Sequence, residues 1–163
     1  MRQIISALSL RGFFVKLTRA AEYAIRCVLY LSAVPAGQVT RRREVSQAMD
    51  IPGAFLGKIA QGLAKAGVLI VRQGANGGYE LALAPKDISL LSVVEAMDGE
   101  IQINECLSRP QACGRSGACA VHQVWDKART QFRETLRGVN FETLAKNGSS
   151  PRSTAAGWRR VNL

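Results

Sequence analysis

Hydrophobic positions in the first part of the chain recur at the three- to four-residue spacing of α-helices. Thr18 is a predicted N-cap of the first helix, because its hydroxyl can accept a hydrogen bond from an early backbone N–H group. The Pro- and Gly-containing turn at 35–37 ends this helix. Its inward face is expected to comprise Ala21, Ala24, Ile25, Val28 and Leu29.

Two shorter helical patterns follow. Thr40 is predicted to cap a second helix over roughly 41–49. Pro52 fits the first position of a third helix, and Gly67 fits the position just after its end. An apolar stripe at helical spacing predicts that this third helix buries Phe55, Leu56, Ile59 and Leu63.

A β-hairpin is predicted after the third helix. The β-branched run 68–71 and the segment 79–83 flank a turn at 74–78 that is rich in Gly and contains Asn-Gly. Three helices followed by a hairpin are typical of the winged helix-turn-helix, in which the hairpin is the wing. The fold class expected is therefore mainly α with a small β-hairpin wing.

The second half of the chain predicts helices again. Ser89 is a predicted N-cap for a helix that runs to residue 97, and a short helix is expected over 141–146. Between them lies a long amphipathic helix over 120–138, about 28 Å in length at 1.5 Å per residue. We expect it to pair with a second copy in a homodimer, rather than to pack on its own domain, through Val121, Val124, Trp125, Ala128, Phe132 and Leu136.

Charge divides the chain in the same way as these patterns. The formal net charge is +10, and residues 1–90 carry 12 basic against 5 acidic side chains, whereas residues 91–146 are neutral. This excess indicates an anionic partner such as nucleic acid or a membrane surface, against the alternative of an ordinary solvated face. No apolar stretch approaches the roughly 20 residues that span a bilayer. Arg outnumbers Lys by 16 to 6, which favours phosphate contacts.

Candidate DNA contacts come from the second helix, the third helix and the wing. Three consecutive arginines fall in the first turn of the second helix, where the helix dipole disfavours cations unless phosphates lie nearby. The N-terminal residues of the third helix would enter the major groove, and the wing would reach phosphates or the minor groove. The predicted contacts are Arg41, Arg42, Arg43, Gly53, Ala54, Lys58, Gln61, Arg72, Gln73, Asn76 and Gly77.

Candidate metal ligands gather in the neutral half. Cys106, Cys113 and Cys119 are separated by six and five residues, whereas Cys27 falls in an apolar helical pattern and is expected in the core. We find no convincing secretory signal, so a cytoplasmic location is expected, where clustered thiols indicate metal binding or redox activity. Zinc sites usually have closely paired cysteines, which are absent here. An iron–sulfur cluster with a further ligand, a disulfide-forming thiol sensor and inert cysteines remain as alternatives.

The chain resembles the Rrf2 family of bacterial transcription regulators over residues 16–146. The resemblance rests on Lys16-Leu17-Thr18-Arg19-Ala20-Ala21-Glu22-Tyr23-Ala24-Ile25-Arg26, Ile51-Pro52-x-x-Phe55-Leu56-x-Lys58-Ile59, Leu63-x-Lys65-Ala66-Gly67, Gly74-x-x-Gly77-Gly78-Tyr79-x-Leu81-Ala82, Val94-x-Ala96-x-Asp98-Gly99, the three clustered cysteines and Val124-Trp125. It implies a dimeric winged-helix protein that binds a double-stranded DNA operator. It also implies an iron–sulfur cluster on Cys106, Cys113 and Cys119 that senses iron–sulfur status, nitric oxide or redox state.

The resemblance offers two fourth ligands. His122 matches the histidine of iron–sulfur-biogenesis regulators, and Glu22 lies where nitric-oxide-sensing relatives present a carboxylate from the partner subunit. We prefer His122, and with it [2Fe–2S] over [4Fe–4S], because imidazole is the better precedented ligand of the two. An exogenous ligand, or none, is the remaining option. The chain departs from the family in a longer gap before Cys113 and in Gln73, where the wing usually has arginine.

These observations predict four segments. Residues 1–15 precede the usual family start and are expected to be a nonessential extension, 16–88 form the DNA-binding domain, 89–146 hold the cysteine loop and dimer helix, and 147–163 form a disordered tail. No catalytic constellation is visible, so neither an enzyme nor a small-molecule substrate is expected. A cluster-free regulator that uses thiol oxidation or a protein partner is the alternative, and an iron–sulfur electron carrier or assembly factor is a more distant one.

Overall fold

The computed structural model describes residues 17–109, 111 and 118–148, and it is mainly helical with one β-hairpin. Cys113, the predicted extension 1–15 and residues 149–163 of the predicted tail lie outside this described part. The elements in chain order are α1 (Arg19–Ser32), α2 (Arg42–Ala48), α3 (Gly53–Lys65), β1 (Leu69–Arg72), β2 (Gly78–Leu81), the 3₁₀ turn η1 (Pro85–Asp87), α4 (Leu90–Asp98), α5 (Glu105–Ser108), α6 (Ala120–Arg137) and α7 (Phe141–Asn147). This order confirms the winged helix-turn-helix.

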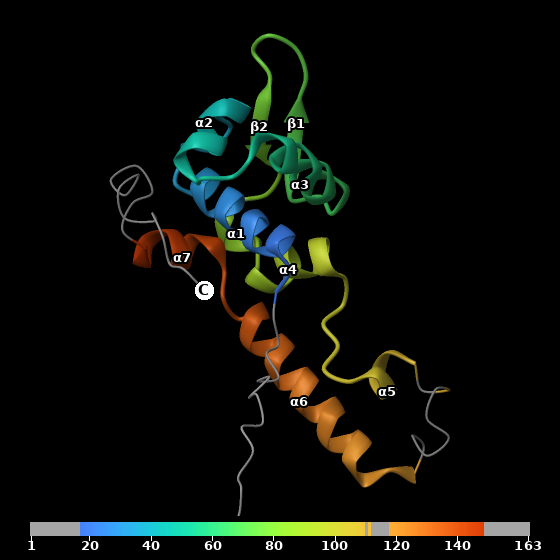
Figure 1. The fold of residues 1–163 in the computed structure, drawn as a ribbon. Coiled ribbons are helices and arrows are strands. Elements are labelled where there is room, and N and C mark those ends of the chain that lie inside the picture. Colours follow the sequence, from blue (N-terminus) through green and yellow to red (C-terminus); the bar gives the residue numbers. More distant parts are fainter. Residues whose placement is uncertain (1–16, 110, 112–117, 149–163) are drawn as a thin grey trace, which may run out of the picture.

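Figure 1 shows α2, α3 and the hairpin at one end of the molecule and α1 beneath them, while α6 extends away at the other end. Helix α1 is central, since it packs against α3, α4 and α7. The predicted cap holds: the hydroxyl of Thr18 accepts a hydrogen bond from the Ala21 N–H at 3.2 Å. The helical pattern predicted that Ala21, Ala24 and Val28 face inward, and all three are fully buried. Cys27, which was also expected in the core, is fully buried too.

The prediction that Thr40 caps α2 is wrong. The N-cap is Arg41, which makes no side-chain capping hydrogen bond, and the helix begins at Arg42. Thr40 instead pairs with Tyr79 of the hairpin, through N···O hydrogen bonds of 2.9 and 2.8 Å in the two directions. This pairing holds the Thr40 backbone extended and its side chain 1% exposed, so the chain enters the helix one residue later.

The prediction that Phe55 lies in the core is also wrong, because its side chain is 55% exposed. Helix α3 buries Leu56, Ile59, Ala60 and Leu63. Successive residues are rotated by about 100° around a helix, so Phe55 falls at the edge of that buried stripe. Its ring lies 6.3 Å from the ring of Tyr23 on α1, centroid to centroid.

The hairpin pairs β1 and β2 antiparallel, with Arg72 opposite Gly78 and Leu69 opposite Leu81. Close packing within and beside the hairpin depends on glycine at two positions. A Cβ atom on Gly77 would lie 2.4 Å from the Arg72 carbonyl oxygen, and one on Gly78 would lie 2.2 Å from the Thr40 carbonyl oxygen. Gly78 is therefore what allows the wing to approach the strand-like segment at Thr40.

Helices α4 and α7 complete the core under α1. Ser89 caps α4 as predicted, accepting from the Ser92 N–H at 3.1 Å. Residues 88–90 and 139–141 run side by side, with Leu90 donating to Val139 at 2.8 Å and Phe141 to Ile88 at 3.0 Å. Phe141 is fully buried and belongs to one cluster with the core residues of α1 and α3. One core thus contains residues from both the predicted DNA-binding segment 16–88 and the predicted segment 89–146. The division of the chain at residue 88 stays a prediction about function.

Helix α6 differs from the other long helices in having no buried residue. Its bounds agree with the predicted amphipathic helix, and its C-terminal half contacts α4. No helix in the described ranges combines the length and apolarity needed to cross a membrane.

Candidate DNA-binding face and cysteine groove

A groove of about 570 Å³ lies between α3 and the hairpin. Arg42 at the start of α2 closes one side, and the base of the wing closes the other. The lining residues are Arg42, Gly57, Ala60, Gln61, Ala64, Val71, Arg72, Gln73, Gly74, Gly77, Gly78 and Tyr79. Several predicted DNA contacts from three separate elements therefore border one concave surface.

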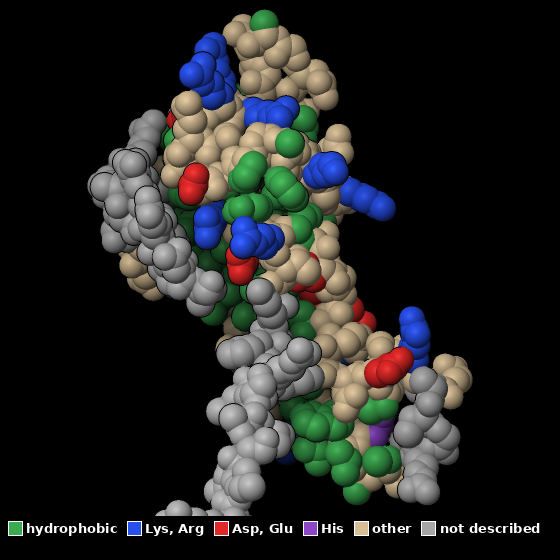
Figure 2. All heavy atoms as spheres, viewed as in Figure 1, with side chains coloured by type: hydrophobic (Ala, Val, Ile, Leu, Met, Phe, Trp, Pro, Cys, Tyr) green, Lys and Arg blue, Asp and Glu red, His purple; other side chains and the backbone are tan. Residues whose placement is uncertain are grey.

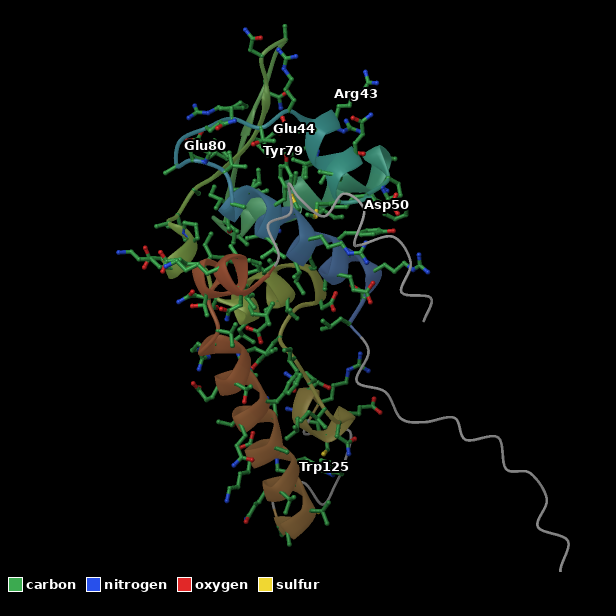
Figure 3. All side chains as sticks on the ribbon, turned by 90° about the vertical axis from the view of Figure 1, so that its left-hand side faces the viewer. Arg43, Glu44, Asp50, Tyr79, Glu80 and Trp125 are labelled. Carbon is green, nitrogen blue, oxygen red and sulfur yellow. The ribbon has the colours of Figure 1, made fainter. Side chains whose placement is uncertain are left out.

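The three consecutive arginines at the start of α2 are all exposed, but they are not equivalent. Arg42 Nη2 donates to the backbone carbonyl of Gly53 at 2.5 Å, which joins the first turns of α2 and α3. Arg43 points away from the body of the protein at the end that carries the hairpin (Figure 3). Arg41 and Arg43 form no ion pair within the described residues, so their charges are available to an external anion.

The outward face of α3 carries few long side chains. Ala54, Lys58 and Gln61 are exposed, and Gly53 is half-buried. Small residues flank them on the groove side, so the helix presents a narrow surface from which Lys58, Gln61 and the exposed Lys65 of the last turn can reach an external ligand. Figure 2 shows Lys and Arg side chains around this end of the molecule, interleaved with apolar surface.

The wing places Arg72, Gln73 and Asn76 at exposed positions, as predicted. Arg72, however, is already paired. Its Nε and Nη2 atoms both donate to Glu80 Oε2, at 3.2 and 3.0 Å. Glu80, which lies on β2 (Figure 3), was not among the predicted site residues, because the strand register is what makes it the diagonal neighbour of Arg72.

A second groove, of about 350 Å³, lies between α5 and the first turns of α6. It brings together Cys106 and Cys119, both half-buried free thiols, and His122. The Nδ1 atom of His122 is buried without a hydrogen-bond partner in the described part of the chain. Asn104, Glu105, Val121 and Trp125 complete the lining.

This donor set fits a soft metal centre. Two thiols and an imidazole whose buried nitrogen lacks a partner are the chemistry that an iron–sulfur cluster uses. Among the described residues no group of three or more His, Cys, Asp or Glu is close enough to hold a metal ion, and Cys113 lies outside that part. Glu22 is on the first turn of α1 and does not line this groove.

Cys27 belongs to neither site. It is fully buried in the core, and burial raises the pKa of its thiol to about 12. A thiol with that pKa is protonated at neutral pH and is a poor metal ligand. This confirms the interpretation of Cys27 as a small core residue.

The predicted dimer helix carries an exposed apolar face. Val121, Val124, Trp125 and Phe132 are 56%, 62%, 37% and 38% exposed, and Ala128 and Leu136 are half-buried. Trp125 lies near the free end of α6, close to the cysteine groove (Figure 3). The apolar face and the cysteine groove therefore adjoin.

A charged cluster connects α6 to α4 and to the segment that leads into α5. Arg133 pairs with Glu95 at 3.0 Å and with Glu100 at 2.5 Å. Arg129 donates to Gln102 at 3.2 Å and pairs with Asp126 at 2.7 Å. We call these five residues and Gln102 the α4–α6 clamp. It ties the helix that carries His122 to the winged-helix part.

Comparisons with known proteins agree with this geometry. The family model Rrf2, described as an iron-dependent transcriptional regulator, matches residues 17–147. The HTH-type transcriptional regulator NsrR of Halalkalibacterium halodurans is 27% identical over 134 residues, which is 82% of this chain and 92% of that protein. The structure of CymR, the global cysteine regulator of B. subtilis, aligns with a TM-score of 0.67 at 21% identity, covering 83% of this chain and all of that one. IscR of T. potens aligns with a TM-score of 0.61 at 18% identity, over 82% and 89% of the two chains.

Proposed function

Because the chain belongs to the Rrf2 family of transcription regulators, whose members are not enzymes, we propose that it is a homodimeric operator-binding protein controlled by an iron–sulfur cluster. The observation that carries the proposal is the cysteine groove, which Cys106, Cys119 and His122 line at one end of the exposed helix α6. The other end of α6 is joined to the winged-helix part.

The DNA-binding role is supported by the groove between α3 and the wing and by the charge around it. Helix α3 would enter the major groove with Ala54, Lys58 and Gln61 outward. Arg41 and Arg43 would neutralise phosphates, and Arg42 would chiefly hold α3 against α2. Gly53 and Gly77 allow close backbone approach, whereas Gln73 and Asn76 offer polar contacts from the wing.

The homodimer is supported by the apolar face of α6. A helix with this much exposed apolar surface and no buried residue is stable when a second apolar surface covers it. The occupant we propose is α6 of a second copy, related by a two-fold axis. This arrangement matches a two-fold symmetric operator, because each protomer would read one half-site.

The cluster would be held by Cys106, Cys113 and Cys119, with His122 as the fourth ligand in preference to Glu22 and [2Fe–2S] in preference to [4Fe–4S]. When bound, the cluster supplies a centre that changes on oxidation, nitrosylation or loss of iron. The chain's own residues do the rest: the ligands would join α5 to the start of α6, and the α4–α6 clamp would relay the position of α6 to the winged helix. Coupling of this kind is worth about 1–3 kcal/mol in operator affinity.

Cluster binding is tested by anaerobic purification followed by visible absorption spectroscopy and iron and sulfide analysis. We expect charge-transfer absorption in the wild type, its loss in Cys106→Ser and a changed spectrum in His122→Ala. Gln123→Ala, an exposed neighbour on the same helix, is the matched control and should keep the spectrum. Loss of the spectrum in Glu22→Ala, with His122→Ala unaffected, would assign the fourth ligand to the carboxylate.

Control of DNA binding is tested with the loaded and stripped protein on promoter fragments selected from genomic DNA. Different affinities for the same fragment at matched ionic strength support the proposal. Equal affinities at every salt concentration would leave a DNA-binding protein without a sensor. Val124→Asp should separate the proposed dimer in analytical ultracentrifugation, because it places a charge at the most exposed large apolar side chain of that face, which is 62% exposed.

Thiol oxidation is the second candidate. It is favoured by the position of Cys106 and Cys119, two free thiols that line one groove. A structure of the oxidised form of CymR from Staphylococcus aureus, with a TM-score of 0.62, has the same fold. If thiol oxidation is the signal, a protein without iron would lose or gain operator affinity on treatment with peroxide, and Cys106→Ser would abolish that response.

A further inference from the structure

The wing contains an ion pair that bears on how the protein distinguishes DNA sequences. Arg72 on β1 and Glu80 on β2 are joined by two hydrogen bonds to the same carboxylate oxygen, at 3.2 Å from Nε and 3.0 Å from Nη2. The Glu80 side chain is 14% exposed and that of Arg72 is 55% exposed. The carboxylate is therefore largely withdrawn from water, and the guanidinium is held over it.

The hairpin register fixes this pair. Ile70 lies opposite Glu80, and Arg72 lies opposite Gly78. Side chains two residues apart on a strand point to the same face, so Arg72 is the diagonal neighbour of Glu80. Strand pairing, rather than chance contact between long surface side chains, brings the two charges together.

The pair removes the wing's net charge. Arg72 and Glu80 are the charged residues of the segment 69–81, so the hairpin is formally neutral. The start of α2, on the other side of the groove, carries Arg41, Arg42 and Arg43. Positive charge in this interface is therefore concentrated at α2, and the wing contributes an oriented guanidinium with little attraction for phosphate at a distance.

We propose that Glu80 is a specificity-determining residue that restrains Arg72, so that the wing adds little to sequence-independent binding of DNA. This inference rests on the proposed DNA-binding function. Phosphate attraction supplies most of the affinity for non-specific DNA. Because Glu80 already neutralises Arg72, this arginine adds to the affinity only at a duplex whose shape lets it make contact. Glu80 thereby increases the difference in affinity between the operator and other sequences.

The inference is tested with Glu80→Gln, which keeps the shape of the side chain and removes its charge. The probe is a 30-base-pair duplex of mixed sequence, titrated at several salt concentrations. Releasing Arg72 should tighten binding about 3- to 10-fold near 0.1 M salt and steepen the dependence of log K on log salt by about one unit.

Arg72→Gln separates this explanation from a general effect of charge. In the wild-type background it should change the salt slope by less than about half a unit, because the Arg72 charge is already compensated. In the double variant it should abolish the gain made by Glu80→Gln. The matched control is Glu142→Gln, which removes an acidic residue paired with Lys146 at 3.3 Å on α7 and should leave the slope unchanged.

The outcomes are distinct. If the wild type binds neither this duplex nor the selected promoter fragments, the proposed function fails. If it binds and Glu80→Gln, shown to be folded by circular dichroism, binds with the same slope, the inference alone is overturned. Should Glu80→Gln prove unfolded, Arg72→Gln decides: a slope reduced by a full unit would show that Arg72 contacts phosphate freely and would overturn the inference, and an unchanged slope supports it.

Discussion

Substituting Phe141 by Ala should destabilise the whole winged-helix part, although residue 141 lies far from it in the sequence. The Phe141 side chain is fully buried at the first position of α7, within the cluster that holds the core of α1 and α3. Its backbone N–H also donates to Ile88 at 3.0 Å, so the ring is fixed where the chain returns to the domain. The surrounding helices have little freedom to close the space that the ring would leave.

The expected magnitude follows from this environment. Phe to Ala at a fully buried site costs about 3–5 kcal/mol, from lost transfer free energy and from the cavity that remains. Domains of this size are stable by about 5–15 kcal/mol, so the substitution removes a large share of the total. Operator binding should fall mainly through the loss of folded protein.

Urea denaturation followed by circular dichroism measures the change, at one fixed protein concentration because the stability of the proposed dimer would depend on it. Thr143→Ala is the control: its side chain is exposed on the same helix, and its backbone N–H keeps the hydrogen bond to Asn140 at 2.9 Å. It should stay within about 0.5 kcal/mol of wild type. A cost below about 1 kcal/mol for Phe141→Ala would refute the assignment of α7 to this core.

Three further predictions concern the core, the wing and a cap. Cys27 should resist iodoacetamide in the native protein, as mass spectrometry would show, and react on unfolding. Modification of Cys27 without unfolding would contradict its burial. The pKa of the thiol is about 12 in the folded protein against 9.0 when exposed, so the free energy of unfolding should fall as pH rises from 9 towards 12. Gly78→Ala should lower the melting temperature and DNA affinity by displacing Thr40, unlike Ala75→Ser at the exposed turn. Asn140→Ala should cost about 1 kcal/mol in urea denaturation through lost capping of α7, and no change would show the cap to be dispensable.

Local signals predicted the elements well. Thr18 and Ser89 cap helices as expected, and Gly67 has the positive φ, +73°, that its position after α3 predicted. Each of these features depends on a few neighbouring residues and on backbone geometry that one residue type satisfies best. The amphipathic pattern of α6 was equally readable, because one face of a helix is specified by spacing alone.

The errors and omissions came from contacts between distant segments. Thr40 has the residue type of a helix cap, but its backbone pairs with the hairpin instead. Phe55 has the apolar spacing of the predicted α3 stripe, but only the other three residues of that stripe are buried. Glu80 contacts Arg72 because of the register of the two strands, which a local pattern does not predict. Cys106, Cys119 and His122 as metal ligands remain a prediction from the sequence, and their place along one groove depends on the packing of α5 against α6.

The position of α7 has a consequence for synthesis of the protein. On the ribosome the residues of α1 to α3 emerge first, yet the core beneath them stays open until Phe141 has been translated. The segment with Cys106 and Cys119 lies between, so these two thiols are translated before the core of the winged-helix part can close. A polypeptide released early from its message would lack a finished core and be open to proteolysis.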